Sequence, residues 1–273
     1  MDRRRALIGL SSASAVAALA APIARVAQAR PASFARRAIG DGISITWLGH
    51  AAFRVDTPSG KVVLIDPWLD NPWAPPQART LERVDLLLVS HGHFDHLGNT
   101  AQLAKARGAT ALSIFEISAY LQGQGVPEAQ SVGMNKGGTV EFDGFRVTMV
   151  EAQHSSGISG DKGIVPGGDP AGFVLRFDDG TSMYHAGDTN VFGDMRLIGG
   201  LYTPQVAMLP IGGHFTMGPL EAAVAARMLA VGTVIPMHYG TFPVLRGTPD
   251  QLVGELAGTN IQVAALTPAQ TFP

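Results

Sequence analysis

Hydrophobic and polar residues alternate along the first part of the chain in a pattern that predicts β-strands. Alternation between turn residues predicts strands near 43–48, 51–56 and 61–66, and the turn TPSG at 57–60 joins the last two. DLLLVS, residues 85–90, is short and almost continuously apolar, which is typical of a strand covered on both faces.

The rest of the chain predicts a second group of strands, followed by alternating helices and strands. The predicted helices are 99–107, 115–122, 193–200, 218–230 and 248–257. The further predicted strands are 139–142, 145–151, 172–177, 181–185, 205–210, 233–237 and 260–265. This order indicates two sheets packed together with helices on the outside. In such a layered fold, polar residues at the carboxyl ends of strands gather at one rim.

Composition fits one globular domain. The chain has 273 residues, 46% of them hydrophobic and 15% charged, which is enough for one well-packed core. Its 33 glycines and 18 prolines lie between apolar runs, so they predict a loop-rich fold. The chain has no cysteine, which excludes disulfides, thiolate metal ligands and a cysteine nucleophile.

The first 29 residues resemble an export signal. Arg3, Arg4 and Arg5 precede an apolar run that ends near Ala27-Gln28-Ala29, the small residues that a signal peptidase needs. RRALI, residues 4–8, further resembles a twin-arginine signal. An uncleaved membrane anchor is the alternative, but this run is only weakly apolar. We therefore expect cleavage and a periplasmic or secreted protein without stable membrane insertion.

The mature chain would then have a short N-terminal extension, residues 30–41, before a domain over 42–273. Removing residues 1–29 takes away four arginines and one aspartate, so the formal net charge changes from −2 to −5. No basic arm remains, which argues against nucleic acid as a partner.

The segment VSHGHFDHLGN, residues 89–99, holds three histidines and an aspartate in a chain with eight histidines. If the segment is extended, His91, His93 and Asp95 point the same way, because side chains alternate along a strand. His96 faces a second point only if the chain turns after Phe94. One loop is thus expected to supply two neighbouring sites.

His154, Asp188 and His238 also follow predicted strands. Nitrogen and oxygen ligands of this kind suit zinc, iron or manganese, and the absence of cysteine argues against a structural zinc site. Taken singly, His154 or His238 is also compatible with a structural role.

These motifs resemble those of a known family. HGHFDH fits the HxHxDH signature of the metallo-β-lactamase superfamily, and HAGDT matches the segment that supplies its bridging aspartate. WLGHAAF, LIDPW, LPIGGHFTMGP and IPMHYGTFP further resemble the small metal-dependent hydrolases near the ascorbate-6-phosphate lactonase. The resemblance extends from residue 42 to about 265, with its motifs in family order, which makes it more specific than any single motif.

The resemblance implies a single-domain α/β fold, a four-layer αβ/βα sandwich, with two divalent metal ions. Zinc is the first expectation, with manganese or iron as alternatives. One ion would be held by His91, His93 and His154, the other by Asp95, His96 and His238, with Asp188 between them.

Such a centre predicts hydrolysis. Bound ions lower the pKa of water from about 16 to roughly 7. We therefore expect a dinuclear hydrolase that uses a metal-bound hydroxide to cleave a small ester or lactone, with a small anionic substrate. A phosphodiesterase or phospholipase D-like activity is the alternative within this fold.

Other classes fit less well. The di-iron reductases of the superfamily carry Glu in place of His93 and need a flavin domain. A noncatalytic metal-binding protein is disfavoured because every expected ligand is present. A serine mechanism is disfavoured because the chain has no G-x-S-x-G elbow. Homo-oligomerisation is left open.

Several residues outside the ligand set are candidates for catalysis or support. We expect His50 and His214, besides Asp95, to act in catalysis, by binding a substrate anion or protonating the leaving oxygen; a hydrogen bond that holds a loop is the alternative for each histidine. Asp66 is expected to orient a ligand histidine, and His185 to be structural. Trp68, Trp73 and Phe215 are candidates for an apolar wall, although packing in the core or at the rim is the commoner role for any one of them.

Overall fold

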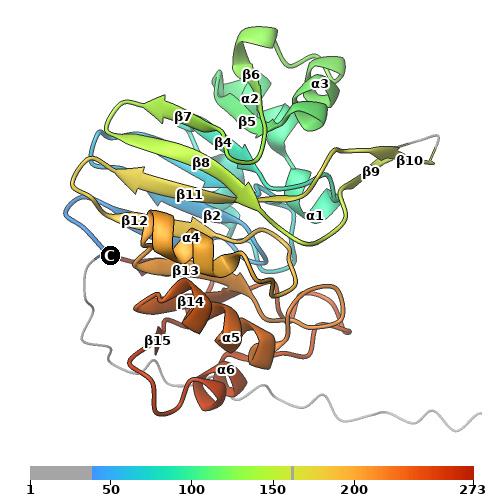
Figure 1. Ribbon diagram of the computed structural model, residues 1–273. Coiled ribbons are helices and arrows are strands. Elements are labelled where there is room, and N and C mark those ends of the chain that lie inside the picture. The colour runs from blue at the N-terminus through green and yellow to red at the C-terminus, as the bar shows by residue number, and fades with distance from the viewer. Residues whose placement is uncertain (1–38, 161–162) are drawn as a thin grey trace, which may run out of the picture. The chain divides into compact units, whose positions relative to one another are not determined.

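Two seven-stranded β-sheets pack face to face in the computed structural model of the protein, which describes residues 39–160 and 163–273 (Figure 1). These residues belong to one compact unit, Arg36–Pro273. The expected leader, residues 1–29, and residues 30–38 of the expected extension lie outside the described ranges and stay predictions. Within those ranges, none of the helices has the length and apolarity to cross a bilayer.

The first sheet has the strand order β16-β1-β2-β3-β4-β5-β6. Its strands are β1 (Ser44–Trp47), β2 (Phe53–Asp56), β3 (Val62–Ile65), β4 (Leu86–Val89), β5 (Thr110–Ile114), β6 (Ser131–Met134) and β16 (Thr271–Phe272). β3 to β6 run parallel, with Leu64 opposite Leu87 and Leu88 opposite Leu112. β3 and β4 are buried along their whole length, which explains their continuously apolar sequences.

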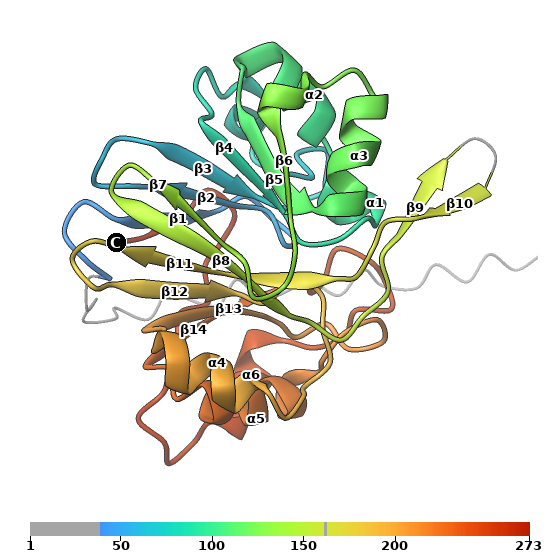
Figure 2. The same cartoon turned by 45° about the horizontal axis from the view of Figure 1, so that its top comes forward.

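The second sheet has the order β15-β14-β13-β12-β11-β8-β7. Its strands are β7 (Thr139–Phe142), β8 (Phe145–Glu151), β11 (Ala171–Phe177), β12 (Ser182–His185), β13 (Val206–Pro210), β14 (Thr233–Met237) and β15 (Gln262–Val263). β12 to β15 are parallel. A separate two-stranded ribbon, β9 (Gly157–Gly160) and β10 (Gly163–Pro166), leaves the sandwich on the side where α1 lies (Figures 1 and 2).

Helices cover the outer faces of the two sheets (Figure 2). The α-helices of the described ranges are α1 (Phe94–Leu97), α2 (Thr100–Arg107), α3 (Phe115–Gly123), α4 (Met195–Tyr202), α5 (Pro219–Leu229) and α6 (Pro249–Glu255), and the 3₁₀ turns are η1 (Pro76–Thr80) and η2 (Glu128–Gln130). α2 and α3 pack on strands of the first sheet, while α5 and α6 pack on strands of the second and α4 packs on α5. The expected αβ/βα sandwich is therefore confirmed.

The core lies between the two sheets. Phe53 and Leu88 of the first sheet, and Phe173 and Val234 of the second, are fully or almost fully buried in one continuous cluster. Burial of apolar surface on this scale is the main stabilising contribution to a domain.

Several short elements differ from the expected ones. β5 passes directly into α3 at Phe115 without a turn residue, so the strand has no sequence boundary. β5, β6, β9, β10 and β16 all lie in segments for which no strand was expected. β16 pairs with the distant β1, and the strand expected at 260–265 is only Gln262–Val263. Pairing between remote segments leaves no periodic signal in the sequence.

Candidate metal centre

The histidine-rich loop after β4 turns more sharply than the sequence indicated. The expected extended path through Asp95 is wrong, because α1 begins at Phe94 and the backbone N–H groups of His96 and Leu97 donate to the carbonyl of His93. Because of this helical turn, the side chain of Asp95 belongs to a different group from those of His91 and His93. The loop does contribute side chains to two neighbouring groups, while the binding of a cation by each group stays a prediction.

His91, His93 and His154 form the first group. Each offers one ring nitrogen within 4.8 Å of the others, and His91 Nε2 lies 2.9 Å from His93 Nδ1. His91 is fully buried, whereas His93 and His154 are partly exposed. Of these three, His93 and His154 therefore face solvent.

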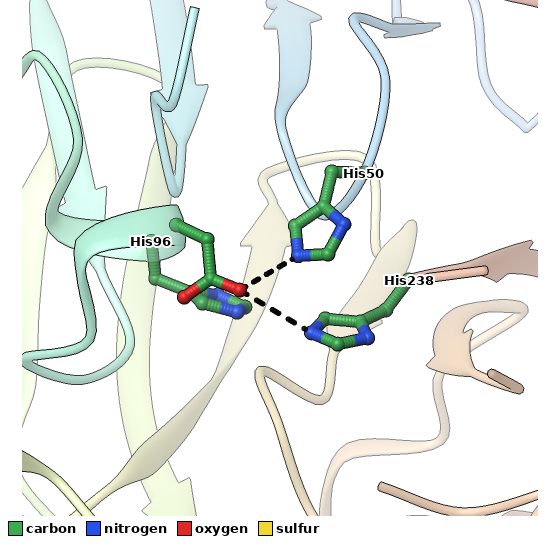
Figure 3. A group of neighbouring side chains, drawn as sticks. His50, His96 and His238 are labelled. Atoms are coloured by element: carbon green, nitrogen blue, oxygen red, sulfur yellow. Dashed lines mark hydrogen bonds and ion pairs between the residues drawn. The ribbon is translucent and has the colours of Figure 1, made fainter. Parts of the chain in front are cut away.

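Asp95, His96 and His238 form the second group, together with His50. The nearest oxygen of Asp95 lies 3.1 Å from His50 Nε2 and 3.8 Å from His238 Nε2. Figure 3 shows His50 and His238 reaching the same carboxylate, with His96 beside it. All four side chains are buried.

Asp188 lies between the two groups. Its Oδ2 atom lies near one nitrogen of four imidazoles: 3.0 Å from His238 Nε2, 3.3 Å from His96 Nε2, 3.5 Å from His154 Nε2 and 4.0 Å from His91 Nε2. Two of these imidazoles belong to each group. The carboxylate is thus placed to be shared by both.

A tight turn after β12 aims Asp188 at this position. Gly187 has a φ of 60°, and a Cβ atom there would lie 2.7 Å from the carbonyl oxygen of Ala171 and 2.8 Å from Cβ of Ser90. Only glycine combines this backbone conformation with such close packing.

Asp66 supports both groups from beneath. Its carboxylate accepts hydrogen bonds from the Ser90 backbone N–H (2.8 Å), the Ser90 hydroxyl (2.6 Å) and His96 Nδ1 (2.7 Å). Because the Ser90 hydroxyl donates to Asp66, it accepts from His91 Nδ1, 3.0 Å away. His91 and His96 therefore both donate from Nδ1 to this support, and their Nε2 atoms point toward the site. The geometry is the one expected for Asp66.

Three residues of the site have left-handed backbone conformations. The φ angles are 53° at His50, 46° at Asp66 and 54° at His238. Such conformations are unfavourable for residues other than glycine and cluster at functional sites. They turn the chain sharply where β3 and β14 end and after β1.

The charges of the site compensate one another. Burial raises the pKa of both Asp95 and Asp188, but the neighbouring histidines outweigh it and hold both pKa values far below normal. Burial lowers the pKa of His238, yet Asp188 and Asp95 raise it to about 9. His96 follows the same balance, and its pKa is raised well above normal. Burial lowers the pKa of His50 to about 4, with His238 adding to this effect.

The residues fit a pair of divalent cations. Seven buried side-chain atoms have no hydrogen-bond partner among the described residues, and four of them belong to this site: His96 Nε2, His238 Nδ1, His238 Nε2 and Asp188 Oδ1. An unpaired buried polar atom costs about 1–3 kcal/mol, so such a cluster indicates a missing partner. Imidazole nitrogens and carboxylate oxygens without thiolates suit zinc, manganese or iron.

The two remaining histidines, His185 and His214, lie outside both ligand groups. His185 is structural, as expected: Nε2 lies 3.0 Å from the carbonyl of Ala51, and Nδ1 accepts from the N–H of Gly187. His214 is exposed in the loop after β13 and lines a surface cavity of about 510 Å³ with Arg246, outside both groups. Its catalytic role stays a prediction.

Of the three candidates for an apolar wall, one lies at this site. Trp68 packs edge-on to His50, with ring centroids 5.2 Å apart. Trp73 instead packs on Trp47, and Phe215 packs on His214. Phe94 and Phe242 take their place beside Trp68.

Comparison with known proteins agrees with this geometry. The family model described as "Beta-lactamase superfamily domain" matches residues 61–239, a range that contains all seven ligand candidates. The chain belongs to the metallo-β-lactamase superfamily.

Its relatives in this superfamily are named metal-dependent hydrolases. A UPF0173 metal-dependent hydrolase of Rubrobacter xylanophilus is 52% identical over 212 residues, covering 77% of this chain and 87% of that protein. A UPF0173 metal-dependent hydrolase of Myxococcus xanthus is 53% identical over 214 residues, covering 78% of this chain and 76% of that protein. The solved structure of Igni18, a metallo hydrolase from Ignicoccus hospitalis, has 36% identity and a TM-score of 0.73, covering 84% of this chain and 97% of Igni18. The expected class, a metal-dependent hydrolase, is confirmed.

Two residues of this hydrolase have roles that the sequence did not indicate. Ser90 links Asp66 to His91, and Thr241 lies 2.6 Å from His50 Nδ1. Ser90 stands next to the HGHFDH motif and Thr241 within IPMHYGTFP. Proximity to these motifs is the only sequence signal for either role.

Proposed function

We propose that this hydrolase is dinuclear and cleaves the C–O bond of a small anionic ester or lactone. The observation that supports it best is the position of Asp188 Oδ2, which lies between 3.0 and 4.0 Å from nitrogens of both ligand groups. A carboxylate shared in this way supports two neighbouring cations better than one.

The first group, His91, His93 and His154, would hold one cation, and Asp95, His96 and His238 the other, with Asp188 shared. Zinc is the first candidate for this nitrogen and oxygen set, with manganese and iron as alternatives. Bound divalent cations supply a water molecule with its pKa lowered to roughly 7 and polarise the attacked carbonyl oxygen.

The protein contributes the charge balance. The ligand set contains only two carboxylates, Asp95 and Asp188, and their ion pairs within the described residues are with histidines. This set leaves a pair of divalent cations incompletely neutralised. An anionic substrate is favoured for that reason.

The protein also contributes access and a binding wall. His93 and His154 are the more exposed ligand candidates, so the substrate would approach from their side. Trp68, Phe94 and Phe242 pack together, with ring centroids 5.5–6.4 Å apart. Trp68 also contacts His50. These rings would receive the apolar part of an ester or lactone.

The test combines metal reconstitution with a substrate panel. Metal-stripped protein is loaded with one or two equivalents of Zn²⁺, Mn²⁺ or Fe²⁺ and assayed on lactones, aryl esters, phosphodiesters and a β-lactam. Lactone or ester turnover that needs the second equivalent is expected. Faster phosphodiester turnover would favour the phosphodiesterase alternative, and no turnover of any substrate contradicts the proposal.

Asp188→Asn is the matching variant, with Asp178→Asn as its control. Asp178 is exposed in the turn between β11 and β12, so its substitution leaves the centre intact. Asp188→Asn removes a charge that both groups share and should reduce turnover at least about 100-fold.

We also propose that the enzyme is exported, on the basis of Arg4 and Arg5 ahead of the apolar run in residues 1–29. Cell fractionation of the full chain and of the Arg4→Lys/Arg5→Lys double variant tests this. Export is expected of the first and not of the second.

A further inference from the structure

His50 uses both ring nitrogens in hydrogen bonds within the protein. Its Nδ1 lies 2.6 Å from the hydroxyl of Thr241, and its Nε2 lies 3.1 Å from Oδ2 of Asp95. We infer that Thr241 and His50 form a positioning relay: Thr241 fixes the tautomer of His50, and His50 holds the carboxylate of Asp95 in place for the second cation. This inference rests on the proposed dinuclear function.

The direction of each hydrogen bond in the relay follows from its last acceptor, the carboxylate of Asp95. An ionised carboxylate can only accept, so Nε2 of His50 must carry a proton. In a neutral imidazole Nδ1 is then unprotonated and must accept. The hydroxyl of Thr241 can donate that hydrogen bond. The relay therefore runs from Thr241 through His50 to Asp95.

The surroundings fix the ring of His50 in this orientation. Its side chain is fully buried, and its backbone carbonyl accepts from the Trp47 indole (3.0 Å) and from the His238 backbone N–H (3.1 Å). The ring packs edge-on against Trp68 and Phe242, with centroid distances of 5.2 and 5.6 Å, and against the ring of His238 at 3.9 Å. A ring held from several sides has few alternative rotamers.

The relay connects three segments that are remote in sequence. Thr241 lies in the loop that starts at His238, His50 in the turn after β1, and Asp95 in α1. Figure 3 shows His50 and His238 approaching one carboxylate from different segments. Since two of these segments carry ligand candidates, the relay would set the distance between Asp95 and His238.

The rival interpretation makes His50 a further ligand of the second cation. Its nitrogen does lie within 4.8 Å of the ligand atoms of Asp95, His96 and His238. However, the ring of His50 lies alongside that of His238, with centroids only 3.9 Å apart.

Rings whose nitrogens converge on one ion spread away from it. In the two proposed ligand sets the centroid distances are accordingly larger, 4.6–5.1 Å among His91, His93 and His154 and 5.5 Å between His96 and His238. The packing of His50 against His238 therefore favours the relay.

Calorimetric titration of metal-stripped full-length protein with Zn²⁺ separates the two interpretations. Thr241→Val keeps the shape of the side chain but removes the donor. It should lower the affinity for the second equivalent of Zn²⁺ about 10–100-fold and leave the affinity for the first equivalent unchanged. Thr241→Ser restores the hydroxyl and should restore the affinity. His50→Gln can still donate an amide hydrogen to Asp95, so it should retain more affinity than His50→Ala.

Long-range ¹H–¹⁵N correlation spectra of the zinc-loaded protein give a readout independent of activity. The relay predicts a His50 ring protonated on Nε2 and unprotonated on Nδ1. A cation on Nε2, or a Thr241→Val protein with unchanged second-site affinity, overturns the relay while leaving the dinuclear function in place. A wild-type protein that binds only one equivalent overturns the dinuclear function and the relay with it.

Discussion

The carboxylate of Asp66 lies 2.7 Å from Nδ1 of His96, and both side chains are completely buried. The same carboxylate reaches His91 through the hydroxyl of Ser90. One buried anion thus orients a ligand candidate of each proposed cation. Imidazole ligands held in this way present their free nitrogen in a fixed direction.

Asp66→Asn should weaken the binding of both cations. An amide lacks the negative charge that holds His96 and the Ser90 hydroxyl, so we expect about a 10–100-fold loss of Zn²⁺ affinity at each site. Calorimetric titration measures it. Asp56→Asn is the control, because Asp56 pairs with Arg54 on the surface, where an ion pair contributes little. Unchanged affinity at both sites would contradict the role of Asp66.

Ser90→Ala should weaken the binding of only one of the two cations. The hydroxyl is the link between Asp66 and His91, whereas His96 contacts Asp66 directly. We expect the affinity of the first cation to fall about 10-fold with the second nearly unchanged. Ser113→Ala, on the neighbouring strand β5 opposite Val89, is the control. Equal losses at both sites would show that Ser90 does not act through His91.

Gly98→Ala should destabilise the turn that follows α1. Gly98 has φ 39° and ψ −125°, and an added Cβ would lie 2.5 Å from Cα of Trp68 and 2.6 Å from the carbonyl oxygen of Pro67. Strain and overlap together should lower the free energy of unfolding by about 2–4 kcal/mol. Urea denaturation of the metal-free protein measures this.

Gly123→Ala is the control for this substitution. Gly123 ends α3, and an added Cβ there meets open space. Its effect should stay within about 1 kcal/mol. If both variants lost the same stability, close packing at Gly98 would not be the cause.

Phe94→Ala should impair substrate binding without loss of metal. The ring is 57% exposed and packs edge-on to Trp68 beside the centre. For an ester with an apolar acyl or aryl group we expect KM to rise about 5–10-fold, the effect of losing roughly 1–1.5 kcal/mol of aromatic contact. Phe115→Ala removes a ring on α3 that is 66% exposed and should leave KM unchanged. An unaltered KM in both variants would exclude Phe94 from the binding wall.

The sequence indicated most strands of the two sheets and the ligand candidates for different physical reasons. Alternation found β1 and β2, the turn TPSG located the start of β3, and the continuous apolar run of Leu86–Val89 found β4, because such patterns report burial directly. The ligand candidates were found by spacing and by their place after strands. Parallel strands bring such residues to one rim.

The remaining features depend on contacts that leave no local pattern. Thr241 and His50 are 191 positions apart, and neither residue alone indicates the hydrogen bond between them. The extended backbone predicted as far as Asp95 was wrong, because a helical turn begins at Phe94. That turn is closed by hydrogen bonds to the carbonyl of His93, which no sequence pattern indicates. The position of Phe94 in the wall depends on that same turn.

Anomalous diffraction at the zinc edge, from crystals of zinc-loaded protein, tests the central claim most directly. We predict two peaks on either side of Asp188 Oδ2, one in contact with His91, His93 and His154 and the other with Asp95, His96 and His238. A single peak, or no peak among these side chains, would contradict a dinuclear centre.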